Sequence, residues 1–188
     1  MLILLVVSCV LANAQSETPG ISEPEAHDLV QSSDFVVVGK LTGRRTVSRR
    51  LTKQELRELN DLGQTIGGSI FKLNVARLLC ASNSSGQKAN SSKKPTEFLL
   101  FESFEKTNAG ETARPSYIDE HFYLAFLSVI PNQKDLAKRL KLPDGIYYEP
   151  TGGMKGLILI NKPETKEVKI TEKACRKLQK TQRISEKR

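Results

Sequence analysis

The sequence predicts a mainly β protein in which the strands close into a small antiparallel barrel and the helices lie at its periphery. Five or six apolar segments of strand length follow one another along the chain, with glycine, proline and other turn-forming residues between them. Segments with a helical pattern are few, do not follow every strand, and are expected only at the edges of the fold. A parallel sheet needs a helical crossover between its strands, so this order favours a closed or partly open barrel.

The first 14 residues have the pattern of a secretory signal peptide. A largely apolar run from Leu2 to Leu11 precedes Ala12-Asn13-Ala14, the small-x-small pattern that signal peptidase accepts. The run is shorter than the roughly 20 residues of a membrane-spanning helix, and no later segment approaches that length. We therefore expect a secreted, extracellular protein whose mature chain begins at Gln15. The alternative is a short apolar strand at the terminus.

The start of the mature chain predicts a leader, a helix and a strand. Residues 15–23 are polar and rich in turn formers, so we expect a flexible leader before a domain that spans residues 24–175. The segment "PEAHDLVQSS" predicts a short helix because it has a proline and a glutamate in its first turn and apolar Leu29 and Val30 further on. A strand follows over Asp34–Lys40, continuing to Thr42 and bent at Gly39 inside the barrel. We expect the next residues, "GRRTVSRR", to form a basic loop.

The rest of the chain predicts a second helix and the remaining strands. Thr52 and Glu55 have the spacing of a capping box, and a leucine stripe ends at Gly63, which predicts a helix over residues 52–62. Alternation of apolar and polar residues predicts a strand that ends at Cys80. The other expected elements are strands over Glu97–Phe104 and His121–Ile130, a basic amphipathic helix over residues 133–143, strands on both sides of the Gly152-Gly153 loop, a last strand around Val168–Ile170, and a cationic tail over residues 176–188.

The cysteines and sequons predict covalent modification. Cys9 is lost with the signal peptide, and the two remaining thiols, Cys80 and Cys175, are expected to pair in an oxidising compartment. The alternatives are an intermolecular bridge or two buried thiols. Asn83 and Asn90 begin Asn-x-Ser sequons in a polar loop, so we expect a glycoprotein.

The net charge of +8 predicts acidic partners. From Lys162 to the end there are ten Lys or Arg residues against four Asp or Glu residues. Outside the cell the expected partners are sulfated glycosaminoglycans such as heparin, anionic extracellular matrix or an acidic protein face, and not nucleic acid. The alternative is a solvated positive surface. The candidate glycosaminoglycan-binding residues are Arg44, Arg45, Arg49, Arg50, Arg176, Lys177, Lys180 and Arg183.

Catalytic chemistry finds little support in the sequence. The two histidines, His27 and His121, do not have the spacing of metal ligands or of a nucleophile–base pair. Adjacent residues on a strand point to opposite faces, so Asp119, Glu120 and His121 do not easily converge on a metal ion. The glycine loop before Leu157 lacks the Gly-Lys-Ser/Thr ending of a phosphate-binding loop. We expect no catalytic residues, no metal and no cofactor.

The order of "HDLVQSSDFVVVGKLTG", "GSIFKLNVARLLC", "TEFLLFES" and "DEHFYLAFLS" resembles the netrin-type (NTR) module. This module is an OB-fold barrel that is shared by netrin C-terminal regions, complement C-terminal domains and tissue inhibitors of metalloproteinases. The resemblance covers roughly residues 26–130 and implies a small OB-like barrel with affinity for extracellular partners and matrix. A looser resemblance is to the amino-terminal region of secreted neuregulin forms. No epidermal-growth-factor cysteine pattern follows here, so no residues are present for receptor activation of that kind.

The sequence departs from the netrin-type pattern in ways that argue against metalloproteinase inhibition through an amino-terminal cysteine. Metalloproteinase inhibitors of this family chelate the enzyme's zinc with a cysteine at the mature amino terminus, whereas this mature chain begins with Gln15 and has no cysteine before Cys80. The usual set of several disulfides is also missing. We therefore expect a non-enzymatic binding protein that engages an extracellular protein partner and glycosaminoglycan. The alternatives are a protease inhibitor that acts through a loop and an enzyme of unrecognised type.

Overall fold

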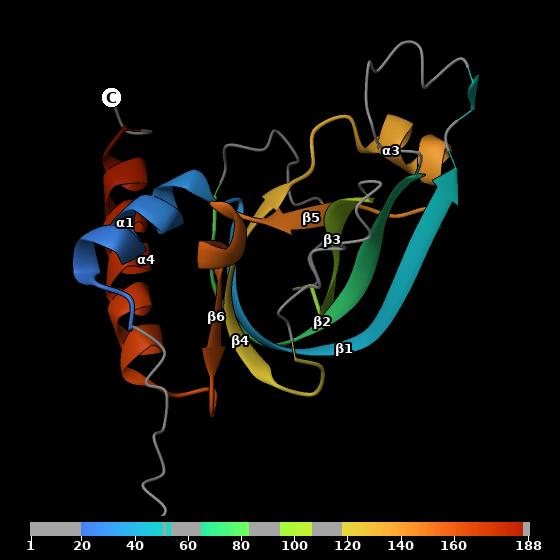
Figure 1. The fold of residues 1–188 in the computed structure, drawn as a ribbon. Helices are drawn as coiled ribbons and strands as arrows, with labels where there is room; N and C mark the ends of the chain where they lie inside the picture. The colour runs from blue at the N-terminus through green and yellow to red at the C-terminus, as the bar shows by residue number, and fades with distance from the viewer. Residues whose placement is uncertain (1–19, 51, 54–64, 83–94, 107–117, 186–188) are drawn as a thin grey trace, which may run out of the picture.

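The protein folds into a curled β-sheet with helices packed at its two ends (Figure 1). The computed structural model describes residues 20–50, 52–53, 65–82, 95–106 and 118–185. Its elements are, in chain order, helix α1 (Glu23–Ser32), strands β1 (Phe35–Arg50), β2 (Thr65–Ala81), β3 (Glu97–Lys106) and β4 (Phe122–Val129), helix α3 (Gln133–Leu140), strand β5 (Tyr147–Pro150), the 3-10 helix η2 (Gly153–Gly156), strand β6 (Leu157–Ile160) and helix α4 (Lys166–Ser185).

Five strands form a ring, so the sheet is barrel-like. The order is β1-β2-β3-β5-β4, and β4 pairs again with β1, while β6 adds to β4. All pairs are antiparallel except β3–β5, which is parallel over Leu99–Leu100. The expectation of a purely antiparallel sheet was therefore wrong at one position. The segment that contains α3 places β5 between β3 and β4. Since β3 and β4 run in opposite directions, β5 is antiparallel to β4 and parallel to β3.

Strand β1 is more than twice as long as the part that pairs with β4. It pairs with β4 over Phe35–Lys40 and with β2 along its whole length. The predicted basic loop after Thr42 is wrong, because the chain passes a β-bulge and continues as a strand to Arg50. Gly43 lies in the bulge with φ 64°, a conformation that glycine adopts without strain.

Gly39 lies where β1 curves and comes close to β2. The register of the two strands shifts between Val38 and Gly39. A Cβ atom on Gly39 would lie 2.7 Å from the carbonyl oxygen of Asn74 and 3.0 Å from the Leu73 side chain. The glycine expected at the bend is therefore needed for close approach of the two strands.

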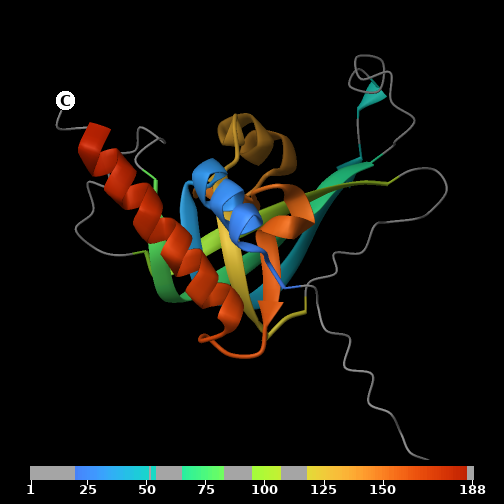
Figure 2. The same ribbon diagram turned by 90° about the vertical axis from the view of Figure 1, so that its left-hand side faces the viewer.

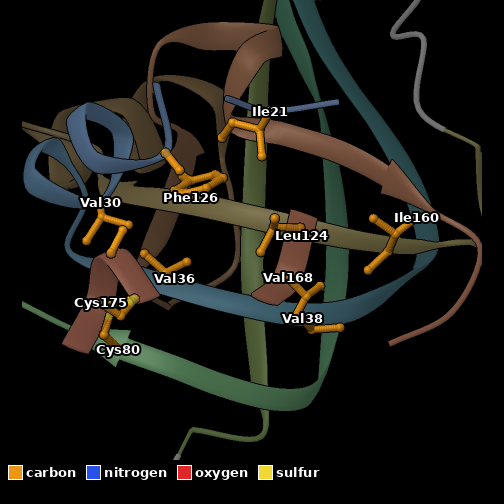
Figure 3. Packing of buried hydrophobic residues seen from close by; sticks show 12 residues of the cluster. Ile21, Val30, Val36, Val38, Cys80, Leu124, Phe126, Ile160, Val168 and Cys175 are labelled. Carbon is orange, nitrogen blue, oxygen red and sulfur yellow. A yellow bond between two sulfur atoms is a disulfide. The ribbon is translucent and has the colours of Figure 1, made fainter. Parts of the chain in front are cut away.

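Helices α1 and α4 pack together over one side of the sheet and enclose the first hydrophobic cluster (Figure 3). The helix predicted from Pro24 is confirmed as α1, and its N-cap residue Ser22 accepts a hydrogen bond from the backbone N–H of Glu25 at 3.4 Å. The buried members of the cluster come from both helices, from the residue before the N-cap of α1, and from β1, β2, β4 and β6. They are Ile21, Ala26, Val30, Val36, Val38, Cys80, Leu124, Phe126, Ile160, Val168, Ala174 and Cys175.

The predicted disulfide is present in this first cluster. Cys80 at the end of β2 and Cys175 on α4 form a bond with an S–S distance of 2.05 Å across 95 positions of the chain. The bond ties α4 to the sheet at the point where Val30 of α1 also lies (Figure 3). By contrast, the last strand predicted around Val168–Ile170 is wrong, since these residues belong to helix α4.

Two further clusters fill the rest of the fold. The second contains Val37, Leu41, Phe71, Leu73 and other residues of β1–β6 on the inner face of the sheet. The third is smaller and lies under α3, with Ile70, Phe101, Leu142 and Tyr147 as its buried members. The end of the fold at α3 therefore has fewer buried apolar residues than the end at α1 and α4.

Several expectations concern residues outside the described part of the chain. These are the signal peptide over residues 1–14, most of the leader, the helix over residues 52–62, and the sequons at Asn83 and Asn90. Among the described residues, no helix combines the length and the apolar composition that crossing a membrane requires.

Candidate functional site

The outer face of α4 displays a row of cationic side chains. The inner face of the helix is buried through Val168, Thr171, Ala174 and Cys175, which leaves the opposite side exposed. Because residues three and four apart lie on the same side of a helix, the exposed cations form one continuous row. Figure 2 shows α4 from this outer side. We call the row the α4 surface; its members are Lys169, Lys173, Arg176, Lys177 and Lys180, which together with Glu172 line a shallow groove of about 460 Å³.

Ion pairs neutralise only part of the α4 surface. Lys173 Nζ donates to Glu23 Oε1 on α1 at 2.9 Å. This hydrogen bond, together with the positive charges of Lys173 and Lys177, holds the pKa of Glu23 below its ordinary value. Arg176 lies 3.8 Å from Glu172, which also pairs with Arg77 of β2.

Three lysines of the α4 surface take no part in the ion pairs of the described residues, although the charge of Lys177 contributes to the lowered pKa of Glu23. Lys169, Lys177 and Lys180 are exposed and form no ion pair there. Exposed ammonium groups that repel one another along a groove favour an anionic ligand that spans several of them.

The predicted residues of the carboxyl-terminal cluster are thus only part of the α4 surface. Arg176, Lys177 and Lys180 belong to it, and Arg183 lies in the last turn of α4, where the structure does not describe its side chain. Lys169 and Lys173 were not among the predicted site residues: Lys169 falls in the strand expected around Val168–Ile170, and Lys173 lies between that strand and the expected tail. The recurrence of Val168, Thr171, Cys175 and Leu178 at helical spacing is the signal that would have identified them.

The four arginines of β1 do not form a single cluster. After the bulge at Gly43, Arg45 pairs with Ile70 and lies on the side of the third hydrophobic cluster, and Val47 and Arg49 follow on that side. Arg50 lies on the opposite side of the strand. Arg44 also faces that other side, with its guanidinium 5.8 Å from the centre of the Phe71 ring. The sequence could not reveal this division, because the bulge changes which residues share a face.

Arg44 is the charged neighbour of a half-buried carboxyl group. Burial raises the pKa of Glu102 on β3, and the charge of Arg44 acts in the opposite direction. Oε2 of Glu102 and the hydroxyl of Ser69, the residue paired with it across the strands, are both buried without a hydrogen-bond partner among the described residues. Arg44 therefore interacts with a half-buried carboxyl group of the sheet in addition to displaying charge.

Arg45 and Arg49 instead join the basic helix α3. The Nε–H group of Arg49 donates to the carbonyl oxygen of Arg139 at the end of α3. Burial raises the pKa of the Tyr147 hydroxyl, and the charge of nearby Arg45 acts in the opposite direction. We call this assembly the α3 surface, with the members Arg45, Arg49, Lys134, Lys138 and Lys141.

A cleft of about 1120 Å³ accompanies the α3 surface. Lys134, Lys138 and Lys141 line one helix face of the cleft, and Leu142 and Ile146 add apolar surface. Asp135 and Asp144 also line it, so the α3 surface has a smaller excess of positive charge than its lysines alone suggest. The helix over residues 133–143 was predicted as basic and amphipathic, but its lysines were not predicted as site residues, because only the topology brings them to β1.

The other polar groups considered from sequence have local partners. Glu120 pairs with Lys40, and His121 Nδ1 lies 3.0 Å from the carbonyl oxygen of Asp119. Within the described residues, no three His, Cys, Asp or Glu side chains gather in the manner of a metal site.

Comparison with known proteins does not assign this arrangement to a family. No protein-family model, no curated protein and no solved structure matches the chain.

Proposed function

We propose that this is a secreted, non-enzymatic binding protein that engages sulfated glycosaminoglycan of the extracellular matrix, together with an extracellular protein partner. The observation that carries the proposal is the exposed row of lysines on α4, of which Lys169, Lys177 and Lys180 form no ion pair among the described residues. The α3 surface provides a second group of cations. A regularly charged polyanion satisfies several such cations at once, with an affinity that falls as salt rises.

The disulfide supports the extracellular part of the proposal. Cys80 and Cys175 are bonded in the core, and such bonds persist mainly in oxidising compartments. The signal-peptide pattern of residues 1–14 agrees with this. In the same way, a ring of five strands with the order β1-β2-β3-β5-β4 supports an OB-like, netrin-type module as the proposed fold family. N-glycosylation at Asn83 and Asn90 remains a prediction of this localisation.

Heparin-column elution of the secreted protein against salt tests the proposal. The α4 variant changes Lys169, Lys177 and Lys180 to Gln, and the α3 variant changes Arg45, Lys134 and Lys138 to Gln. A control variant changes Lys40, Lys155 and Lys162 to Gln, which removes the same formal charge away from both surfaces.

The wild type is expected to elute above the physiological ionic strength of about 0.15 M. Both surface variants are expected to elute at lower salt, and the control close to the wild type. Elution of the wild type at or below physiological ionic strength, or an equal loss in the control, would show that the charge only solvates the surface.

A further inference from the structure

The α4 surface and the α3 surface lie at opposite ends of the fold. Figure 1 shows α4 at one end of the sheet and α3 with the end of β1 at the other. The outer face of α4 points away from the sheet, since its inner face is buried against β2 and α1. The α3 surface is attached to the far part of β1, beyond the segment that pairs with β4. The sheet therefore separates the two groups of cations.

Each surface is anchored to the fold separately, and each lies along its own groove or cleft. The α4 surface lines the groove of about 460 Å³ and is fixed by the Cys80–Cys175 disulfide. The lysines of the α3 surface line the cleft of about 1120 Å³, and the helix that carries them packs on the third hydrophobic cluster. At physiological ionic strength the field of exposed charges decays over about 8 Å, so cations on opposite sides of a domain act independently.

From this placement we infer that the protein binds two sulfated polysaccharide chains at once, one on each surface, and so cross-links them. The inference rests on the proposed function, because it assigns the same ligand class to both surfaces. A short oligosaccharide occupies one surface only, whereas long chains are joined through the protein. Two sites on one protein also raise the overall avidity for a dense matrix beyond that of either site.

Binding stoichiometry tests the two-site arrangement. Isothermal titration calorimetry with a heparin-derived hexasaccharide is expected to give two bound hexasaccharides per wild-type protein and per control variant. The α4 variant and the α3 variant are each expected to bind one, with unfolding midpoints like that of the wild type. One hexasaccharide per wild-type protein, or two in either surface variant, would overturn the inference and leave polysaccharide binding itself intact. No binding by the wild type would overturn the proposed function as well.

Light scattering tests cross-linking directly. Titration of full-length heparin into the wild type or the control is expected to raise the scattering and then lower it again when heparin is in excess, because each protein then meets separate chains. Both surface variants are expected to bind heparin without this rise. If the wild type binds two hexasaccharides but full-length heparin gives no scattering, a single chain wraps around the protein and the inference fails.

Discussion

The α4 surface and the α3 surface both display positive charge, but their helices are anchored to the fold in different ways. Helix α4 buries Val168, Thr171, Ala174 and Cys175 and is bonded covalently to β2. Helix α3 has no fully buried residue. It is attached by partly buried leucines, by the side-chain oxygen of Gln133, which accepts from the backbone N–H of Tyr147 at 2.8 Å, and by the bond between Arg49 and its last turn.

This difference shows how a small domain holds like charges together. Neighbouring ammonium groups on a helix repel one another, and a buried opposite face fixes them in spite of that repulsion. The α4 surface is therefore a preorganised array, whereas the α3 surface depends on a few contacts between two elements. We expect the α4 surface to bind a polyanion more tightly, because less order has to be created on binding.

Removal of the disulfide is expected to have the largest effect on this comparison. The bond joins residues 95 positions apart, and a disulfide that closes a loop of this size stabilises the folded protein by about 2–5 kcal/mol. The double variant Cys80→Ser, Cys175→Ser should lose that much free energy of unfolding. Relative to the wild type, its hydrogen exchange should accelerate more in α4 than in α3. Denaturant unfolding with and without reductant provides the measurement. An unchanged midpoint would mean that the apolar face alone anchors α4.

Truncation of Leu136 is expected to weaken the α3 surface selectively. Leu136 is a partly buried residue packed against the third cluster, so Leu136→Ala should cost about 2 kcal/mol, the low end for a leucine truncation. Hydrogen exchange should accelerate in α3 and remain unchanged in α4. Equal acceleration in both helices would contradict independent anchorage of the two surfaces.

Replacement of Thr171 by valine is expected to strengthen the α4 anchorage. Thr171 is fully buried, and its hydroxyl has no hydrogen-bond partner among the described residues. Thr171→Val removes that polar group and keeps the shape, which should raise the free energy of unfolding by about 1 kcal/mol. Thr181→Val is the matched control, because the exposed hydroxyl of Thr181 donates to the carbonyl oxygen of Lys177 at 3.1 Å. Destabilisation by Thr171→Val would contradict this account, because it would mean that the hydroxyl forms a stabilising hydrogen bond.

The smallest expected effect is the pH dependence of the contact between α1 and α4. The pKa of Glu23 in the folded protein lies below the ordinary value of 4.5, so the carboxylate stabilises the fold above that pH. This contribution is lost as the pH falls through 4.5 toward the folded pKa. The difference in urea midpoint between wild type and Glu23→Gln should therefore shrink in acid. A difference that stays constant with pH would exclude the ion pair as its cause.

Local sequence patterns predicted the elements that depend on near neighbours. The helix from Pro24, the strands ending near Cys80 and Ile130, and the Cys80–Cys175 bond are all present. The strand segment Arg44–Arg50 was missed because its glycine and charges favour a loop locally, and only pairing with β2 across the bulge makes it a strand.

The two cationic surfaces were predicted only in part, for a related reason. Val168, Ile170 and Thr171 are β-branched and favour a strand locally, so the tertiary burial of one helix face decided the structure of α4. The meeting of α3 with Arg45 and Arg49 depends on topology, because the interacting residues are about 90 positions apart in the chain. Charge density could be predicted from sequence, but the division of that charge between two ends of the fold could not.

Site-resolved NMR titration with the heparin-derived hexasaccharide tests the central claim most directly, which is that the α4 surface is the principal polyanion site. The signals of Lys169, Lys177 and Lys180 are expected to shift at the lowest ligand concentrations and those of Lys134 and Lys138 at higher ones, while Lys155 and Lys162 remain in place. Shifts spread equally over all these lysines, or an α4 surface that does not respond, would contradict the claim.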